Sequence, residues 1–153
     1  MKTILTIATF LFIISAVSGQ KLEIKDGLYY KNGALYSGIY KEYYDSTQIL
    51  KAELTIKNGK MDGVSNFYYK NGKLKSQQSY LNGMKDGLWI TYNEEGVKTA
   101  EARYLLDKKD GYWFIWDDNG VKRYEMHYTK GVKDGIWYMW DENGTLTMER
   151  KYS

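Results

Sequence analysis

The sequence predicts an all-β fold, an elongated single-layer antiparallel meander of repeated β-hairpins. Asp-Gly pairs recur with a step of 24 residues, with their glycines at positions 63, 87, 111 and 135. Two further markers keep this step, an inner glycine and a tyrosine: Gly72, Gly96, Gly120 and Gly144, and Tyr80, Tyr104, Tyr128 and Tyr152. Three independent markers with one period indicate a repeat protein whose units stack on their neighbours.

One unit, residues 86–110, has the local signals of two strands and two turns. Its LWITY segment is bulky and aromatic, NEEG has turn chemistry, and KTAEARY alternates strictly. This alternation predicts that Ala102 and Tyr104 point to one face, and that Glu101 and Arg103 point to the other. We therefore expect each unit to be a β-hairpin with one solvent-facing side.

The first 19 residues have the features of a secretory signal peptide. Lys2 precedes an apolar run over residues 4–14, and the small residues Val17 and Gly19 follow where a signal peptidase would cleave. A membrane anchor is the alternative, but the run is shorter than the roughly 20 residues that span a bilayer. No cysteine follows that could carry a lipid. We expect a secreted, periplasmic or cell-envelope protein with no integral membrane span after cleavage.

The remaining chain predicts a single repeat domain over residues 20–153. In the KLEIKD segment, Leu22 and Ile24 alternate with charged residues, which predicts an edge strand protected against association. The step from Gly38 to Gly63 is 25 residues rather than 24, so the early units are atypical. The domain then divides into a cap, partial and atypical units, and regular units: 20–26, 27–61 and 62–153.

Composition argues against several functional classes. The 22 Lys and Arg residues exceed the 19 Asp and Glu residues by only 3, and they are spread through the units, so no nucleic-acid partner is expected. The same small net charge makes attachment to a membrane surface a weak alternative. Cysteine is absent and His127 is the single histidine, which disfavours a catalytic triad or structural zinc. The turn aspartates lack the dense pattern of a calcium repeat. We expect no enzyme activity and no cofactor.

Aromatic residues occupy two repeat positions, and these are the candidate binding residues. Equivalent rings in neighbouring units should lie about 10 Å apart, with a tyrosine of the intervening strand between them. Strict alternation places the two rows on opposite faces unless a bulge intervenes. The rows could be the core of a sheet without a second layer, or an exposed binding strip, or both. The candidates are Trp89, Trp113 and Trp137, then Tyr92, Trp116 and Trp140, with Tyr104 and Tyr128 in the gaps between neighbouring rings of one row.

From Asp26 to Ser153 the chain resembles the MORN repeat variant family. The resemblance rests on DGLWITYNEEGVKTAEARY, on DGYWFIWDDNGVKRYEMHY and on the opening YYKNGALYSGIYKEYY. It implies a single-layer antiparallel sheet of hairpins used as a scaffold or binding surface, with no shared catalytic residues. The family includes proteins labelled YwqK-type antitoxins, an association that transfers poorly to an exported chain because a cytoplasmic toxin would be out of reach.

These observations favour an exported, non-catalytic scaffold for protein-protein interaction. We expect it to bind another protein, or another copy of itself, through an aromatic-lined face of the sheet. The alternative is a carbohydrate or cell-wall binding module, since glycan-binding repeats also use aromatic hairpins. The sequence does not identify the partner.

Overall fold

The computed structural model describes residues 21–45 and 47–153, so the predicted signal peptide lies outside the described residues. Within this part of the chain every regular element is a β-strand. None of it forms a helix of the length and apolar character needed to cross a membrane. The fold is all-β and antiparallel, as the alternation and turn signals predict.

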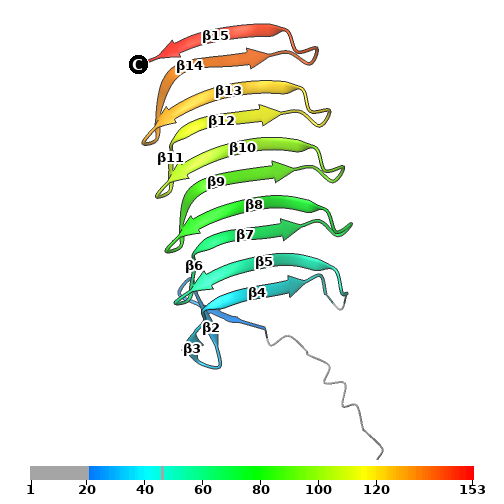
Figure 1. Ribbon diagram of the computed structural model, residues 1–153, viewed down its shortest axis with the longest axis vertical. Helices are drawn as coiled ribbons and strands as arrows, with labels where there is room; N and C mark the ends of the chain where they lie inside the picture. The colour runs from blue at the N-terminus through cyan, green and yellow to red at the C-terminus, as the bar shows by residue number, and fades with distance from the viewer. Residues whose placement is uncertain (1–20, 46) are drawn as a thin grey trace, which may run out of the picture.

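Most of the chain forms one sheet in which hairpin follows hairpin (Figure 1). Ten strands follow one another along the sheet: β4 (Gly38–Tyr43), β5 (Leu50–Lys57), β7 (Gly63–Tyr68), β8 (Leu74–Leu81), β9 (Met84–Tyr92), β10 (Lys98–Leu105), β12 (Gly111–Trp116), β13 (Lys122–Thr129), β14 (Val132–Trp140) and β15 (Leu146–Tyr152). Two short strands, β6 (Lys60–Met61) and β11 (Lys108–Lys109), pair with β5 and β10. The predicted single-layer meander is confirmed.

Each of the four hairpins from β7–β8 to β14–β15 closes through a turn that contains a glycine. In the β9–β10 turn, the N–H of Asn93 donates to the carbonyl of Val97 at 2.9 Å, and the N–H of Gly96 donates to the carbonyl of Asn93 at 3.0 Å. Gly96 has φ +88°, a left-handed conformation that a β-branched residue adopts only with strain. The inner glycine of the period therefore marks this turn.

The aspartates of the Asp-Gly pairs join one unit to the next at the strand ends that lie opposite the hairpin turns. In three of the four pairs the carboxylate accepts a hydrogen bond from a backbone N–H in the following inter-hairpin loop, 20 residues further along the chain. The pairs are Asp62 with Asn82 at 3.0 Å, Asp86 with Leu106 at 3.2 Å, and Asp110 with Lys130 at 2.8 Å. The aspartate of the repeat thus satisfies a backbone donor that the sheet ladder leaves free.

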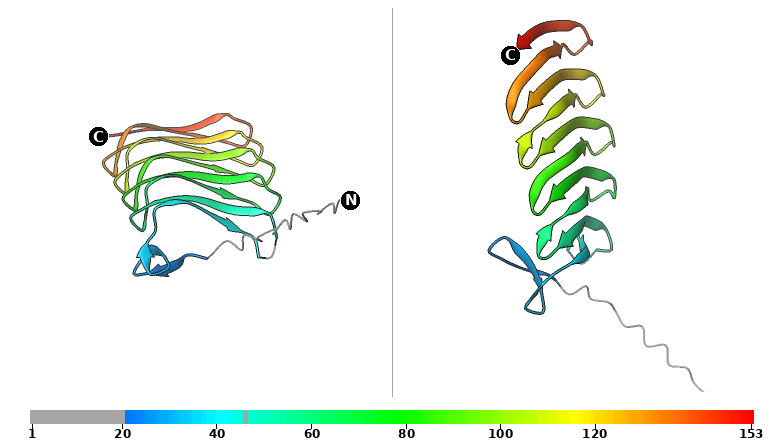
Figure 2. Two further views of the ribbon diagram at one scale, coloured as in Figure 1. Left: turned by 60° about the horizontal axis from the view of Figure 1, so that its bottom comes forward. Right: turned by 60° about the vertical axis from the view of Figure 1, so that its left-hand side comes forward.

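The N-terminal segment folds differently from the prediction. The strands β1 (Glu23–Lys25), β2 (Leu28–Lys31) and β3 (Ala34–Leu35) form a separate three-stranded sheet, seen as a small lobe at one end of the array (Figure 2). The expectation that the KLEIKD segment adds an edge strand to the repeat sheet is therefore wrong. The physical reason is Leu22, which is buried in a cluster with Ala52, Leu54 and Ile56 of β5.

The large sheet has two faces of different character. We call one the ladder face, because it carries the tyrosines and tryptophans described below, and the other the mixed face, which carries Glu101 and Glu125. Alternation along the strands places every buried residue of the large sheet on the ladder face. These residues are Ala52, Leu54, Ile56, Ser65, Ser76, Ala102, Tyr128 and Trp137.

Candidate binding surfaces

A continuous row of alternating tyrosine and tryptophan rings runs along the ladder face from β8 to β15. Neighbouring ring centroids lie between 4.7 and 5.6 Å apart, and their planes are inclined by 52° to 66°. Aromatic pairs favour such tilted and edge-to-face arrangements. This aromatic ladder consists of Tyr80, Trp89, Tyr104, Trp113, Tyr128, Trp137 and Tyr152. The prediction that Tyr104 and Tyr128 fill the gaps between the tryptophans is confirmed.

Each ladder tryptophan is also fixed by a hydrogen bond to the backbone. Its indole N–H donates to the carbonyl of the residue that precedes a ladder tyrosine: Trp89 to Ser79 at 2.8 Å, Trp113 to Arg103 at 3.0 Å, and Trp137 to His127 at 3.0 Å. Near Ser79 and His127 the register of the sheet shifts, which interrupts the regular backbone pairing. The indoles thus complete the hydrogen bonding of the sheet, so these rings are part of its construction.

Lysine side chains cover the ladder with the same period. Lys85, Lys109 and Lys133 each place their ammonium group over one tryptophan and one tyrosine. The distances to the ring centroids are 4.6 and 5.0 Å for Lys85, 4.1 and 4.7 Å for Lys109, and 4.7 and 5.0 Å for Lys133. Cation–π contacts of this kind are favourable by about 0.5–1 kcal/mol at exposed sites. The ladder face is therefore aromatic and cationic.

The tyrosine hydroxyls of the ladder are partly enclosed as well. The Tyr80 hydroxyl donates to the side-chain oxygen of Gln78 at 2.6 Å, and burial raises the pKa of Tyr80 to about 12. Burial also raises the pKa of Tyr104 above its ordinary value. Both observations indicate that the ladder excludes water from its rings.

A second group of aromatic rings lies on the mixed face. Tyr112 stacks on Phe114 with 5.9 Å between centroids, and Phe114 lies 5.7 Å from Trp116. In the next unit Tyr138 lies 5.8 Å from Trp140. We call these five residues the mixed-face strip. Tyr112 is 53% exposed, so part of this strip is open to solvent.

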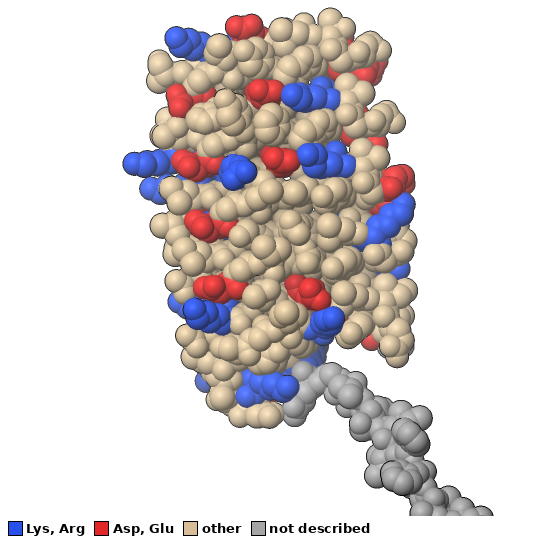
Figure 3. Space-filling model, viewed as in Figure 1, with Lys and Arg blue, Asp and Glu red and all other residues tan. Residues whose placement is uncertain are grey.

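Ion pairs lie beside the mixed-face strip. Lys98 contacts Glu101 at 2.8 Å and Lys122 contacts Glu125 at 2.8 Å, and the two lysines also lie 4.5 and 5.2 Å from the rings of Trp116 and Trp140. On the face seen in Figure 3, acidic and basic side chains lie next to one another in rows along the strands, with uncharged surface between the rows. The mixed face thus combines exposed rings with balanced charge.

The structure divides the predicted binding residues between the two faces. Trp89, Trp113, Trp137, Tyr104 and Tyr128 belong to the ladder, whereas Trp116 and Trp140 lie on the mixed face. Alternation places Tyr92 on the mixed face as well. The two rows thus lie on opposite faces, which the sequence left open, although a register shift follows Ile115.

Several residues of these surfaces are not among the binding residues predicted from the sequence. The ladder lysines recur every 24 residues, at positions 85, 109 and 133, so the period itself could have found them. The prediction of one polar, solvent-facing side per hairpin is only half right, because Tyr112, Phe114 and Tyr138 share the mixed face with the glutamates. In the last two units, residues directly beside the ladder tryptophans in the sequence are aromatic too, and they point to the mixed face.

The side chain of His127 is partly enclosed by its neighbours. Its side chain is 28% exposed, its ring meets Tyr112 edge-on at 4.8 Å, and its Nδ1 lies 3.3 Å from a carboxylate oxygen of Asp134. Hydrogen bonds from the Thr129 hydroxyl and the Gly135 N–H lower the pKa of Asp134. An aromatic and an acidic neighbour thus partly enclose the imidazole.

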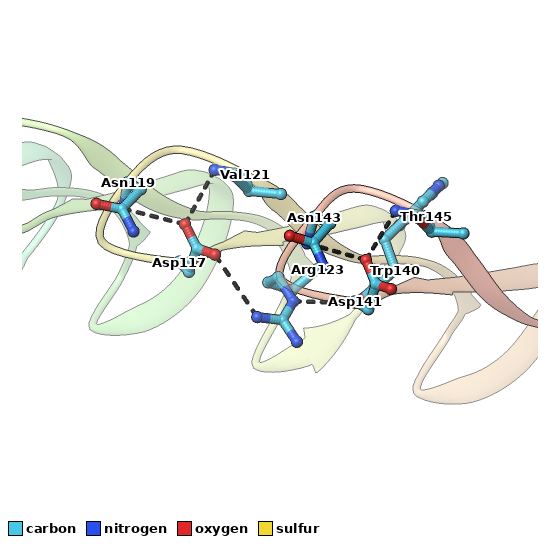
Figure 4. A network of polar contacts seen from close by, with 8 residues as sticks. All are labelled: Asp117, Asn119, Val121, Arg123, Trp140, Asp141, Asn143 and Thr145. Atoms are coloured by element: carbon cyan, nitrogen blue, oxygen red, sulfur yellow. Dashed lines mark hydrogen bonds and ion pairs between the residues drawn. The ribbon is translucent and has the colours of Figure 1, made fainter.

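The turn aspartates bind backbone groups of their own turns (Figure 4). Asp117 accepts from the N–H groups of Asn119 and Val121, both at 3.0 Å, and Asp141 accepts from its two equivalent residues at 2.9 Å. Arg123 joins two units, since its Nε donates to the carbonyl of Trp140 at 3.0 Å and a terminal nitrogen lies 3.5 Å from Asp117. These polar groups shape the turns and connect neighbouring hairpins.

Part of the sequence matches a known family of repeats. The model of the MORN repeat variant matches residues 61–82, 109–130 and 133–153, which hold the β7–β8, β12–β13 and β14–β15 hairpins. No curated protein matches the chain. The antitoxin association stays a prediction. The chain thus carries MORN-variant repeats over these three segments.

Proposed function

We propose that the protein is an exported, non-catalytic scaffold that binds another protein, or a second copy of itself, through the mixed face. The observation that carries this proposal is the difference between the two sets of tryptophans. The ladder indoles are fixed to backbone carbonyls, whereas neither Trp116 nor Trp140 donates its indole N–H to a partner among residues 21–45 and 47–153. Their polar groups stay available to a ligand.

The composition of the mixed face suits a protein partner. Protein interfaces combine aromatic anchors at their centre with a polar rim, and a few such anchors supply most of the binding energy. The mixed-face strip offers the anchors, with Tyr112 53% and the neighbouring Ile136 39% exposed. The Lys98–Glu101 and Lys122–Glu125 pairs supply charged groups at its side.

The surroundings of the histidine support a non-catalytic role. The Thr129 hydroxyl donates to Asp134 at 2.8 Å rather than to His127, so the imidazole does not activate this neighbouring hydroxyl. A catalytic nucleophile requires a base within hydrogen-bond reach. Export rests on the apolar run and small residues of the first 19 positions.

Site-specific photo-crosslinking tests the proposed face. A photoreactive phenylalanine replaces Tyr112 on the mixed face or, as the matched control, Tyr124 on the ladder face, which is 38% exposed. Both variants are exposed to an extract of the cell envelope and medium and then illuminated. We expect a discrete protein adduct, or a dimer of the chain, from position 112 alone. Adducts from position 124 alone, or from neither position, would overturn the assignment of the mixed face.

A further inference from the structure

The ladder face carries a row of basic side chains, and the proposed protein-binding function gives these side chains no role. From β9 to β15 it carries Lys85, Lys109, Lys133 and Arg150, each over a ring of the ladder. The glutamates of these strands point to the other face, where their register partners are Phe114 for Glu101 and Glu125, and Tyr138 for Glu149. The glutamates of these strands therefore lie on the opposite face from the ladder lysines.

The three ladder lysines differ from the lysines of the mixed face in their partners. Lys98 and Lys122 each contact a glutamate at 2.8 Å. Among the described residues, by contrast, none of the ladder lysines has a carboxylate within 4.0 Å. Lys109 reaches the Tyr128 hydroxyl at 3.4 Å, and otherwise the ammonium groups face ring surfaces. Their remaining N–H donors are thus available to an anionic ligand.

The spacing of the lysines selects among anionic ligands. Equivalent lysines lie two strands apart, which corresponds to about 10 Å along the array. A nucleic-acid strand carries a phosphate about every 3.4 Å, so most of its charges would lack a partner here. A membrane surface favours exposed apolar groups that insert, whereas the ladder rings under the lysines are buried or half-buried and fixed by hydrogen bonds. A polymer with more widely spaced charges fits better.

We propose that the ladder face binds an acidic polysaccharide that lies along the array. The ladder lysines would contact its carboxylate groups, while the rings beneath them stay packed in the sheet. The chain presents this surface as a row of repeated subsites, so affinity should grow with the length of the polymer. This second surface is independent of the proposed protein-binding mixed face, and either proposal can fail without the other.

Calorimetric titration with hyaluronate and unsulfated chondroitin, which carry a carboxylate on every second sugar, and with neutral dextran as a control, tests the proposal. The test variant is K85Q/K109Q/K133Q, and the matched control is K98Q/K122Q, which removes lysines that also lie over rings but on the mixed face. We expect the wild-type chain to bind the acidic polymers but not dextran, with weaker binding at higher salt. The triple variant should lose about tenfold or more in affinity, and the control should stay within about twofold.

Thermal unfolding checks that both variants are folded. If the triple glutamine variant is not, single K109Q is compared with K109R, which keeps the charge and should keep the affinity. The proposal is overturned if neither acidic polymer binds, if dextran binds equally, or if the triple variant binds like the wild type. It is also overturned if the lysines matter only for binding to phosphatidylglycerol vesicles, which would make the ladder face a membrane surface instead.

Discussion

At the scale of single residues, each ladder tryptophan combines three interactions that are usually separate. Trp113 packs between Tyr104 and Tyr128, donates its indole N–H to the carbonyl of Arg103, and lies under the ammonium group of Lys109. A sheet without a second layer has no facing side chains to cover its rings. Here, neighbouring rings on the same face and the aliphatic part of the lysine side chains cover each ring instead.

Tyr80 makes this enclosure measurable through its pKa. The pKa of about 12 in the folded chain exceeds the ordinary value of 10.0. Because the folded-state pKa is raised, this contribution to stability is complete below about pH 10 and is lost as the pH rises to about 12. We expect the melting temperature of the wild-type protein to fall over this range and the fall to be smaller in Tyr80→Phe. Tyr112→Phe, at an exposed site, is the control, and equal falls in all three proteins would refute the enclosure.

The sequence predicts some of these residue roles but not others. Trp113 and Trp116 are three positions apart in a strand, so their opposite orientation follows from alternation alone. The hydrogen bond from Trp137 to the His127 carbonyl could not be predicted, because it depends on a register shift between Glu125 and His127 that leaves the regular pairing incomplete. A shift of this kind arises from the pairing of two strands, and neither strand reveals it alone.

At the scale of elements, the hairpin is the unit that the sequence specifies best. Asn-Gly and Glu-Gly turns, strand alternation and the Asp-Gly marker all agree on its limits, and the structure follows them. The N-terminal lobe could not be predicted in this way. An alternating segment such as LEIK suits the edge of either sheet, and the burial of Leu22 against Ala52 and Ile56 decides between them.

A pair of glycine substitutions tests how the hairpins cooperate. Gly96→Val and Gly144→Val introduce similar strain, since the two glycines have φ +88° and +78° and neither lacks space for a Cβ. We expect about 1–3 kcal/mol of local strain at each site. The β14–β15 hairpin can release this strain by opening locally, whereas β9–β10 has bonded neighbours on both sides. Urea unfolding should therefore show a greater loss for Gly96→Val, and an equal or reversed order would contradict stacking of hairpins along one axis.

At the scale of the whole molecule, the protein is a linear array whose units contact mainly their neighbours. Its one cluster of buried apolar residues lies where the N-terminal lobe meets β5, and the rest of the described array depends on the aromatic ladder. Such arrays derive their stability from repeat and interface contributions that add along the chain. The sequence predicts this linear arrangement through its period, because each repeat brings the same contacts.

Export is a prediction about the whole chain. Intact-mass measurement on protein recovered from the medium or the cell envelope should give a chain that begins near Gln20, because a short apolar run with small residues at its end is typical of a cleaved signal peptide. Protein expressed without residues 1–19 and recovered from the cell interior provides the reference mass. Recovery of the exported protein with Met1 to Gly19 intact would contradict cleavage.

We expect the ladder rings to hold the sheet together, and the rings of the mixed-face strip to serve the proposed protein partner instead. Thermal unfolding of Trp113→Ala and Trp116→Ala compares them within one strand. Trp113→Ala removes a ladder ring and a backbone hydrogen bond, so we expect a loss of about 3 kcal/mol or more. Trp116→Ala removes a ring of the mixed-face strip, and we expect a loss of about 1 kcal/mol.

At roughly 2–4 °C per kcal/mol for a chain of this size, the two melting temperatures should differ by about 4 °C or more. We expect Trp113→Ala to melt at the lower temperature and Trp116→Ala to stay close to the wild type. Equal melting temperatures, or a lower value for Trp116→Ala, would contradict it.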